Sequence, residues 1–139
     1  MFHFFDVAEI ATRFPERAGS TIVDTYLTDQ PSASSRLFRI YYPIPPHYHA
    51  TCEEHLYLLT GRVMFIAGNE PPRILEPGQL VTFDRNVVHA ISEVLAGPAV
   101  FLTVDTPRRV PGDVIYVNPE DAKIRPFVTH LEQLSSQQP

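Results

Sequence analysis

The sequence of 139 residues contains a single cysteine, Cys52, so it cannot form an internal disulfide. Basic residues are scarce, because 11 Lys and Arg stand against 16 Asp and Glu and give a formal net charge of −5. That balance argues against a nucleic-acid binder with a basic face. No apolar segment approaches the ~20 residues of a membrane span, and no basic run precedes an apolar stretch at the N-terminus, as a signal peptide requires. We therefore expect a cytoplasmic protein that binds neither nucleic acid nor membrane.

Proline, in contrast, is abundant, with 14 residues, roughly twice its ordinary share. Because proline interrupts helices and avoids central strands, this abundance predicts many short elements joined by turns. A short helix is expected from Asp6 to Arg13, with Asp6 as its N-cap, and Pro15 ends it. The length indicates one domain, residues 1–139.

The middle of the chain reads as strands separated by Gly/Pro turns, which predicts an all-β sandwich or barrel. Its runs are rich in β-branched and aromatic residues, as strands are. The tail is expected to form a brief helix from Thr129 and then a polar, disordered end over 135–139. The expected strands cover residues 21–27, 36–42, 55–60, 63–67, 73–75, 80–83, 87–93, 99–105 and 114–117.

One segment carries a pattern of metal ligands. His47 and His49 are two residues apart, so on an extended chain both imidazoles face the same side. Glu54 follows after a short loop, and His89 lies on a later strand. Neutral imidazole and carboxylate suit a divalent ion of Fe, Mn, Ni, Cu, Co or Zn, and these residues alone do not choose among them.

These residues also stand at the spacing of a known family. The run His47-x-His49-x4-Glu54-x6-Gly61 resembles the first motif of the cupin superfamily, and Gly78-x10-His89 resembles the second. The resemblance implies a double-stranded β-helix, or jelly-roll, barrel over about residues 20–117. A short N-terminal extension (1–19) and an irregular C-terminal tail (118–139) would flank it. It also implies that His47, His49, Glu54 and His89 are the metal ligands.

The motif spacing decides several neighbouring positions. Glu54 is favoured over Glu53 because only Glu54 keeps six residues before Gly61. The second motif has Asn86 where the family usually has glycine, and asparagine tolerates the positive φ that such a turn needs. Glu93 replaces the usual second-motif asparagine, and whether Glu93 or Cys52 contributes to the site stays open.

Polar residues near the motifs suggest how a substrate could bind. Arg36 and Arg39 lie on opposite faces of one strand, so one of them can point inward and hold a substrate carboxylate. We select Arg39, with Tyr41, as the candidate substrate-binding residues, and expect Asp105 and Arg108 to form an ion pair at the barrel rim. His3 and His130 lie near the chain ends and need no function.

Three functions remain open from the sequence. Three neutral imidazoles and one carboxylate on a divalent ion leave a net charge of about +1. Octahedral coordination then leaves two positions open, and this cationic centre favours a small anionic oxygen ligand. The first function is therefore a metal-dependent enzyme of the dioxygenase, isomerase or lyase type. The second is a non-catalytic cupin that binds a small ligand or metal, as a sensor does. The third is a metal-free, epimerase-like cupin with a histidine base. Cupin relatives commonly dimerise, so we also expect a homodimer, with the MFHFF start in its interface.

Overall fold

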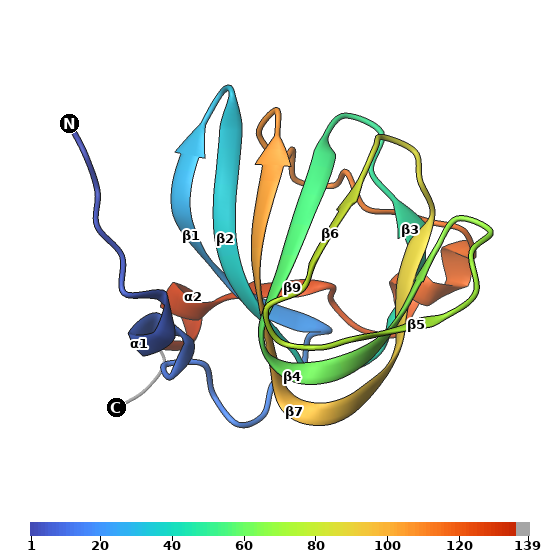
Figure 1. The fold of residues 1–139 in the computed structure, drawn as a ribbon, viewed down its shortest axis with the longest axis horizontal. Helices are drawn as coiled ribbons and strands as arrows, with labels where there is room; N and C mark the ends of the chain where they lie inside the picture. Colours follow the sequence, from blue (N-terminus) through green and yellow to red (C-terminus); the bar gives the residue numbers. More distant parts are fainter. Residues whose placement is uncertain (136–139) are drawn as a thin grey trace.

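A computed structural model of the chain describes residues 1–135. Within them, nine strands form one mixed sheet that folds over on itself (Figure 1). This is the predicted double-stranded β-helix, and the fold class is confirmed. The strands are β1 (Ile22–Gln30), β2 (Ala33–Ile40), β3 (Ile44–Tyr48), β4 (Glu53–Ala67), β5 (Arg73–Leu75), β6 (Leu80–Phe83), β7 (His89–Thr106), β8 (Ile115–Tyr116) and β9 (Val128–His130).

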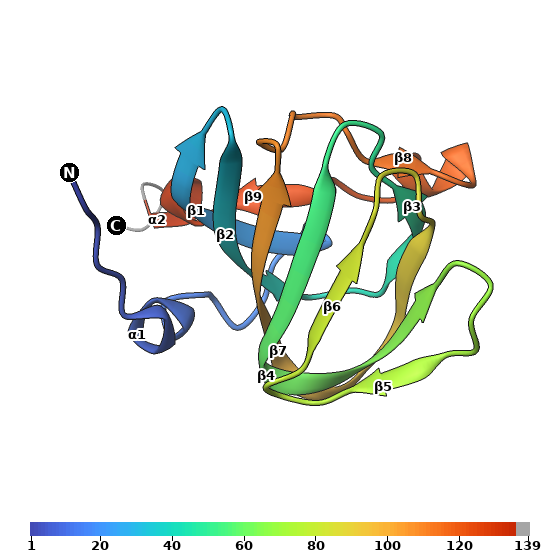
Figure 2. The same ribbon diagram turned by 45° about the horizontal axis from the view of Figure 1, so that its top comes forward.

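Two long strands, β4 and β7, connect the two halves of the jelly roll. They pair with each other antiparallel along most of their length and bend together, as Figure 2 shows. The C-terminal half of β7 also pairs with β2, whereas its N-terminal end pairs with β3. The sequence predicted each long strand as two shorter ones, because Gly61 and Gly97-Pro98 interrupt the patterns.

Gly61 lies at the bend of β4 and cannot carry a side chain. Its φ is +88°, a conformation that L residues rarely adopt. A Cβ built there would lie 2.6 Å from Ala99 Cα and 2.6 Å from Pro98 O on β7. The family's first-motif glycine therefore has a local physical reason, since the two long strands touch at this residue.

Alternation along the strands creates an inner and an outer apolar cluster. Phe38, Leu58 and Phe101 belong to the inner cluster between the two halves of the roll. Leu37 and Val100 belong to the outer cluster, which the helix α1 (Val7–Ala11) covers together with Phe14. On β2, even-numbered residues thus face inward and odd-numbered residues outward, which decides the direction of each arginine discussed below.

The predicted N-terminal helix is present but shorter than expected. The helix α1 extends only from Val7 to Ala11, and Asp6 caps it by accepting a hydrogen bond from the Glu9 backbone N–H. Strand β3 was not expected, because Pro45 and Pro46 lie inside it. A register shift between Ile44 and His47 accommodates them, since a bulge needs fewer ladder hydrogen bonds.

The C-terminal segment is more regular than expected. A 3-10 helix, η1 (Pro119–Lys123), precedes β9, which pairs in parallel with β1. The short helix α2 (Leu131–Ser135) follows, close to the predicted position. Residues 136–139, which complete the predicted polar end, lie outside the described residues. No helix in the described part of the chain is long and apolar enough to cross a membrane.

Candidate metal centre

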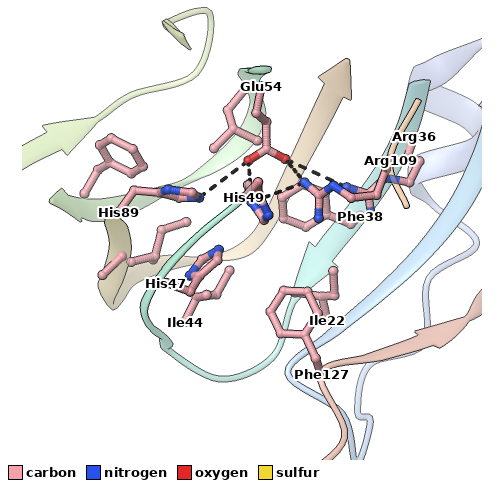
Figure 3. Close-up of a pocket in the computed structure, with 14 residues that line it drawn as sticks. Ile22, Arg36, Phe38, Ile44, His47, His49, Glu54, His89, Arg109 and Phe127 are labelled. Carbon is pink, nitrogen blue, oxygen red and sulfur yellow. Dashed lines mark hydrogen bonds and ion pairs between the residues drawn. The ribbon is translucent and has the colours of Figure 1, made fainter. Parts of the chain in front are cut away.

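Strand pairing brings three histidines from two distant segments together. His47 on β3 and His89 on β7 are direct cross-strand partners. His49 follows β3 at the two-residue spacing, and its carbonyl accepts a hydrogen bond from the Asn86 backbone N–H. One ring nitrogen from each histidine lies within 4.8 Å of the others, and all three side chains are buried (Figure 3). The described histidine cluster is thus compatible with a metal ion.

The turn before His89 depends on Asn86, as predicted from the second motif. Asn86 has a φ of 68°, and among the described residues no other non-glycine residue has a positive φ. Asparagine tolerates this conformation better than most residues. The prediction that Asn86 replaces the family glycine is therefore confirmed, and the turn keeps His89 in register with His47.

Backbone carbonyls fix the tautomer of each ring. His47 Nδ1 lies 2.8 Å from Pro45 O, His49 Nδ1 lies 2.5 Å from Asp113 O, and His89 Nδ1 lies 3.0 Å from Val87 O. A carbonyl oxygen only accepts, so each Nδ1 carries the proton and donates it. In the neutral ring the Nε2 atom then presents a lone pair, which is the arrangement that metal-binding histidines require.

Glu54 lies beside this cluster and divides its two oxygens between different neighbours. Oε1 lies 3.4 Å from His49 Nε2 and 3.5 Å from His89 Nε2. Oε2 accepts hydrogen bonds from Arg109 Nη2 at 2.6 Å and from Thr103 Oγ1 at 3.1 Å. The adjacent Glu53 is exposed. Of the two glutamates, it is therefore Glu54 that the structure places at the histidines.

The charge states favour a cation between these groups. Burial, together with the neighbouring His89, lowers the pKa of His47 to about 3, so its ring is neutral at pH 7. Burial opposes ionisation of Glu54, but the Arg109 guanidinium and the two nearby histidines hold its pKa well below the usual value. The neutral His47 ring, the Nε2 atoms of His49 and His89, and a Glu54 carboxylate oxygen thus face one another. The donor set therefore fits a divalent transition metal.

The space at the cluster is small. A cavity of about 30 Å³ lies between His47, His49, His89 and Glu54, with apolar walls that include Ile44 and Phe127. We call it the inner cavity. A water molecule needs about 10–15 Å³ on the same measure. The inner cavity thus has room for an ion and a water molecule but not for an organic ligand.

Buried ion pairs extend from Glu54 away from the histidines. Arg109 Nη2 lies 3.0 Å from Asp105 Oδ1, and Arg36 Nη2 lies 3.4 Å from Asp105 Oδ2. Arg36 Nη1 continues to Asp24 Oδ2 at 3.1 Å. Burial and the neighbouring Glu54 raise the pKa of Asp105. Two arginines therefore balance three closely spaced carboxyl groups, and this balance holds Glu54 in place.

The structure places both candidate substrate-binding residues away from the inner cavity. Arg39 lies on the outward face of β2, where its guanidinium stacks 5.0 Å from the centre of the Tyr41 ring. The Tyr41 hydroxyl donates to Pro15 O at 2.5 Å, within the outer cluster. Neither residue lines the inner cavity, and Arg36 is the inward arginine. Sequence parity showed that the two arginines face opposite ways but not which face is the interior.

The expected Asp105–Arg108 ion pair was also assigned to the wrong partner. Arg108 is exposed and pairs with Asp29, at 2.7 Å from Nε to Oδ1. Arg109 turns inward and takes the Asp105 carboxylate. Arg109 was missed because adjacent arginines in a Pro-bounded loop give no periodicity that tells the buried one from the exposed one.

Two residues left open by the sequence can be placed. Glu93 is exposed on β7. Cys52 is buried, with Sγ 3.9 Å from Asp105 Oδ1, and it does not belong to the histidine cluster. Burial raises the pKa of the Cys52 thiol to about 11, which keeps it protonated at neutral pH. Neither observation supports a ligand role for these residues.

With this geometry in place, the chain can be compared with known proteins. Residues 41–105 match the family model for the cupin domain. The chain therefore contains a cupin domain. A search of the curated proteins finds no match for the cupin.

Solved structures share the fold of this cupin. KdgF from Halomonas sp. has 19% identity and a TM-score of 0.59, over 64% of this chain and 81% of that one. A protein with a double-stranded β-helix domain from Klebsiella pneumoniae has 16% identity and a TM-score of 0.64, over 77% and 86%. The DMSP lyase DddQ from Ruegeria pomeroyi has 21% identity and a TM-score of 0.62, over 72% and 53%. At such low identities the likeness shows the fold alone.

Proposed function

We propose that this cupin is a metal-dependent enzyme that acts on a small anionic substrate bearing oxygen groups. His47, His49, His89 and Glu54 hold the divalent ion, which is one of Fe, Mn, Ni, Zn, Co and Cu. The observation that carries this proposal is the shared orientation of the three rings. Every Nδ1–H is donated to a backbone carbonyl, so every Nε2 lone pair is directed into the cluster, where that of His49 also lies 3.3 Å from Arg109 Nη2.

The chain's own residues determine what the site can do. A divalent ion held there would polarise an oxygen group of the substrate. Arg109 holds Glu54 ionised and in place, and Thr103 donates to the same carboxylate oxygen. The apolar walls, which include Phe65 and Ile91, exclude bulk water and strengthen these charge interactions.

The reaction is of the dioxygenase, isomerase or lyase type. A DMSP lyase is among the proteins that share the fold, which makes a lyase assay worth including in the first screen. Oxygen uptake tests the dioxygenase type, and isomerisation of hydroxy-carbonyl compounds tests the isomerase type. The homodimer and the cytoplasmic location remain predictions, and the exposed Phe2 and Phe4 of the N-terminal segment are available for an interface.

The decisive experiment measures metal bound to protein purified without a histidine tag. Glu54→Gln and His47→Ala should both lose a stoichiometric metal that the natural sequence retains. Matched controls exist for each, because Glu53 is exposed beside Glu54 and His55 lies outside the cluster. Glu53→Gln and His55→Ala should keep the metal. Equal metal content in Glu54→Gln and Glu53→Gln would refute the ligand set.

The small inner cavity favours a second candidate, a non-catalytic cupin that binds a metal or small ligand. About 30 Å³ leaves little room for a substrate in direct contact with the ion. This candidate predicts stoichiometric metal with no turnover in any of the three assays. The enzyme proposal predicts turnover that disappears together with the metal in Glu54→Gln.

A further inference from the structure

A second and much larger cavity lies next to the inner cavity. Its volume is about 510 Å³, and it shares Arg36, Arg109 and Phe127 with the inner cavity. We call it the outer cavity. Pockets for small organic ligands usually measure about 300–1,000 Å³. The outer cavity therefore has the volume of a small-ligand pocket and lies beside the histidine cluster.

The outer cavity contains arginine Nε–H donors for an anionic oxygen, whereas the Nη groups of the same arginines already pair with carboxylates. Three arginines and two aspartates line it, although the chain as a whole is acidic. Arg108 is already paired with Asp29 through two hydrogen bonds. Arg36 and Arg109 are 5% and 7% exposed, and the Nε of each has no hydrogen-bond partner among the described residues. Buried donors without partners are costly, so a bound anion would stabilise them.

A histidine in the same lining is held by a buried aspartate. Parallel pairing of β9 with β1 sets His130 opposite Asp24, and His130 Nδ1 lies 2.5 Å from Asp24 Oδ1. Asp24 Oδ1 accepts the Nδ1–H hydrogen bond, so Nε2 is directed away from Asp24, and a ring that carries this one proton offers Nε2 as an acceptor. His130 retains 44% side-chain exposure, whereas Asp24 is buried. This pair gives the outer cavity an oriented acceptor for a hydroxyl group of a ligand.

The remaining wall of the outer cavity is apolar. Val110, Pro111 and Val114 come from the loop after β7, and Val128 comes from β9. A ligand that matches all three kinds of wall has a carboxylate, a hydroxyl group and a short apolar body. Neither a metal ion nor an inorganic anion would use the apolar part.

We propose that the outer cavity binds a small organic hydroxy acid. The unpartnered Nε–H groups of Arg109 and Arg36 donate to its carboxylate. His130 accepts a hydrogen bond from its hydroxyl group, and Val110 and Val114 contact its apolar body. The proposal rests on the proposed function only in that it names the substrate class of that site. Binding in the outer cavity itself uses residues that are not metal ligands.

The test uses mandelate as the probe, with phenylacetate lacking the hydroxyl group and mandelamide lacking the charge. Each is titrated into the full chain by calorimetry, once after chelator treatment and once after metal loading. Mandelate should bind about tenfold more tightly than phenylacetate, as one good hydrogen bond allows, and more tightly than mandelamide. Failure of mandelate to bind in both states would overturn the proposal.

Two variants locate the binding. Val110→Glu adds a negative charge to the cavity wall and should weaken mandelate binding by roughly tenfold or more. Val117→Glu is its control, because Val117 is similarly exposed but does not line the cavity. His130→Ala should remove the preference for mandelate over phenylacetate. Equal effects of the two glutamate variants, or an unchanged preference in His130→Ala, would place the ligand elsewhere.

The outcome is separable from that of the proposed function. Metal content of Glu54→Gln decides the ion site, whereas mandelate binding and its response to Val110→Glu decide the outer cavity. Binding in the chelated protein with no metal site would leave the hydroxy-acid proposal standing and refute the metal enzyme. Metal retention without mandelate binding would do the reverse.

Discussion

Arg109 Nη2 donates to Glu54 Oε2 at 2.6 Å, and the same nitrogen lies 3.3 Å from His49 Nε2. A fixed protein cation thus touches both a carboxylate and an imidazole of the candidate metal centre. Glu54 and Asp105 raise the pKa of Arg109 although burial opposes its charge, so the guanidinium stays ionised. The Arg109 guanidinium therefore stabilises Glu54 in the metal-free site, and a metal ion that binds there experiences repulsion from this positive charge.

The first prediction concerns the removal of this charge. Arg109→Gln leaves Glu54 and Asp105 partly unpaired in the interior, which should destabilise the metal-free protein by about 3–5 kcal/mol. Because a divalent ion supplies positive charge at the same place, added Zn²⁺ should stabilise the variant more than the natural protein. Urea unfolding with and without Zn²⁺ measures both effects.

The control for this prediction is Arg39→Gln, since Arg39 lies on the outer face of the same barrel. Arg39→Gln should change the unfolding free energy by less than about 1 kcal/mol. It should leave the stabilisation by Zn²⁺ unchanged. Arg109→Lys covers the case in which Arg109→Gln does not fold. A Zn²⁺ response identical in all the variants would contradict the coupling.

The candidate site was predictable where its geometry is local. The i, i+2 spacing of His47 and His49 and the motif spacing of Glu54 and His89 were sufficient to select the residues that now lie together. Local backbone chemistry also allowed the positive φ of Asn86 to be foreseen. The shared direction of His47 and His49 and the turn at Asn86 are local, whereas the family resemblance supplied Glu54 and His89, because His89 meets His47 only through pairing of β7 with β3.

The features that were missed depend on the barrel's closure. Arg36 and Arg39 differ only in which face of β2 becomes the interior, and the pairing of β2 with β7 decides that. His130 gains its partner through β9, which pairs with a strand about 100 residues earlier. No periodicity within a short window carries such information, because the contact exists only after distant strands have paired.

The second prediction is a pH dependence of the metal-free protein. Burial and His89 lower the pKa of His47 to about 3, against about 6.5 in the unfolded chain. Between these values the unfolded state binds the extra proton, so stability is full above pH 6.5 and falls as the pH falls. Each pH unit costs up to about 1.4 kcal/mol from this one group.

Urea unfolding at several pH values between 6.5 and 4.5 measures this slope. His47→Gln removes the titrating group, so the slope of the unfolding free energy against pH should decrease by the share of one proton, about 1.4 kcal/mol per pH unit at most. His55→Gln should leave this slope unchanged. Glu54 contributes in the same direction but at lower pH, because its depressed pKa is compared with an unfolded value near 4.5. Equal slopes in the two histidine variants would contradict the assignment to His47.

The third prediction tests the contact between the two long strands. Gly61→Ala forces a Cβ to 2.6 Å from the backbone of Ala99 and Pro98 and should destabilise by at least about 2 kcal/mol. Gly68→Ala is the matched control, since Gly68 also has positive φ but open space around it. It should cost about 1–2 kcal/mol, the backbone part alone. If thermal unfolding shows equal losses, steric contact with β7 does not matter.

The fourth prediction concerns the buried thiol. Because burial raises the pKa of Cys52 to about 11, little thiolate exists at pH 7, and Cys52 is 1% exposed. A disulfide reagent should therefore label the folded protein slowly and the urea-unfolded protein rapidly. Rapid labelling of the folded protein, with circular dichroism unchanged, would show that the segment next to Glu54 opens readily.

The fifth prediction concerns Asp113, which positions His49 without being a ligand. Its carbonyl accepts the His49 Nδ1–H, and its carboxylate accepts from the backbone N–H groups of Ala50 and Thr51 at 2.8 and 3.0 Å. Asp113→Ala releases the segment after His49 and so loosens the carbonyl that sets the ring. Loss of such an orienting contact typically lowers metal affinity by about 10–100-fold.

Competition with a chromogenic chelator measures the affinity, and urea unfolding of the metal-free protein runs beside it. Thr51→Val removes only the hydroxyl that donates to Asp113 and should have a smaller effect on affinity. Asp113→Asn keeps one side-chain oxygen as an acceptor, so its metal affinity should lie between those of Asp113→Ala and Thr51→Val. A purely structural role would reduce stability in Asp113→Ala while leaving metal affinity unchanged. An orienting role reduces the affinity even under conditions where the variant is fully folded, because His49 Nε2 no longer points at the ion.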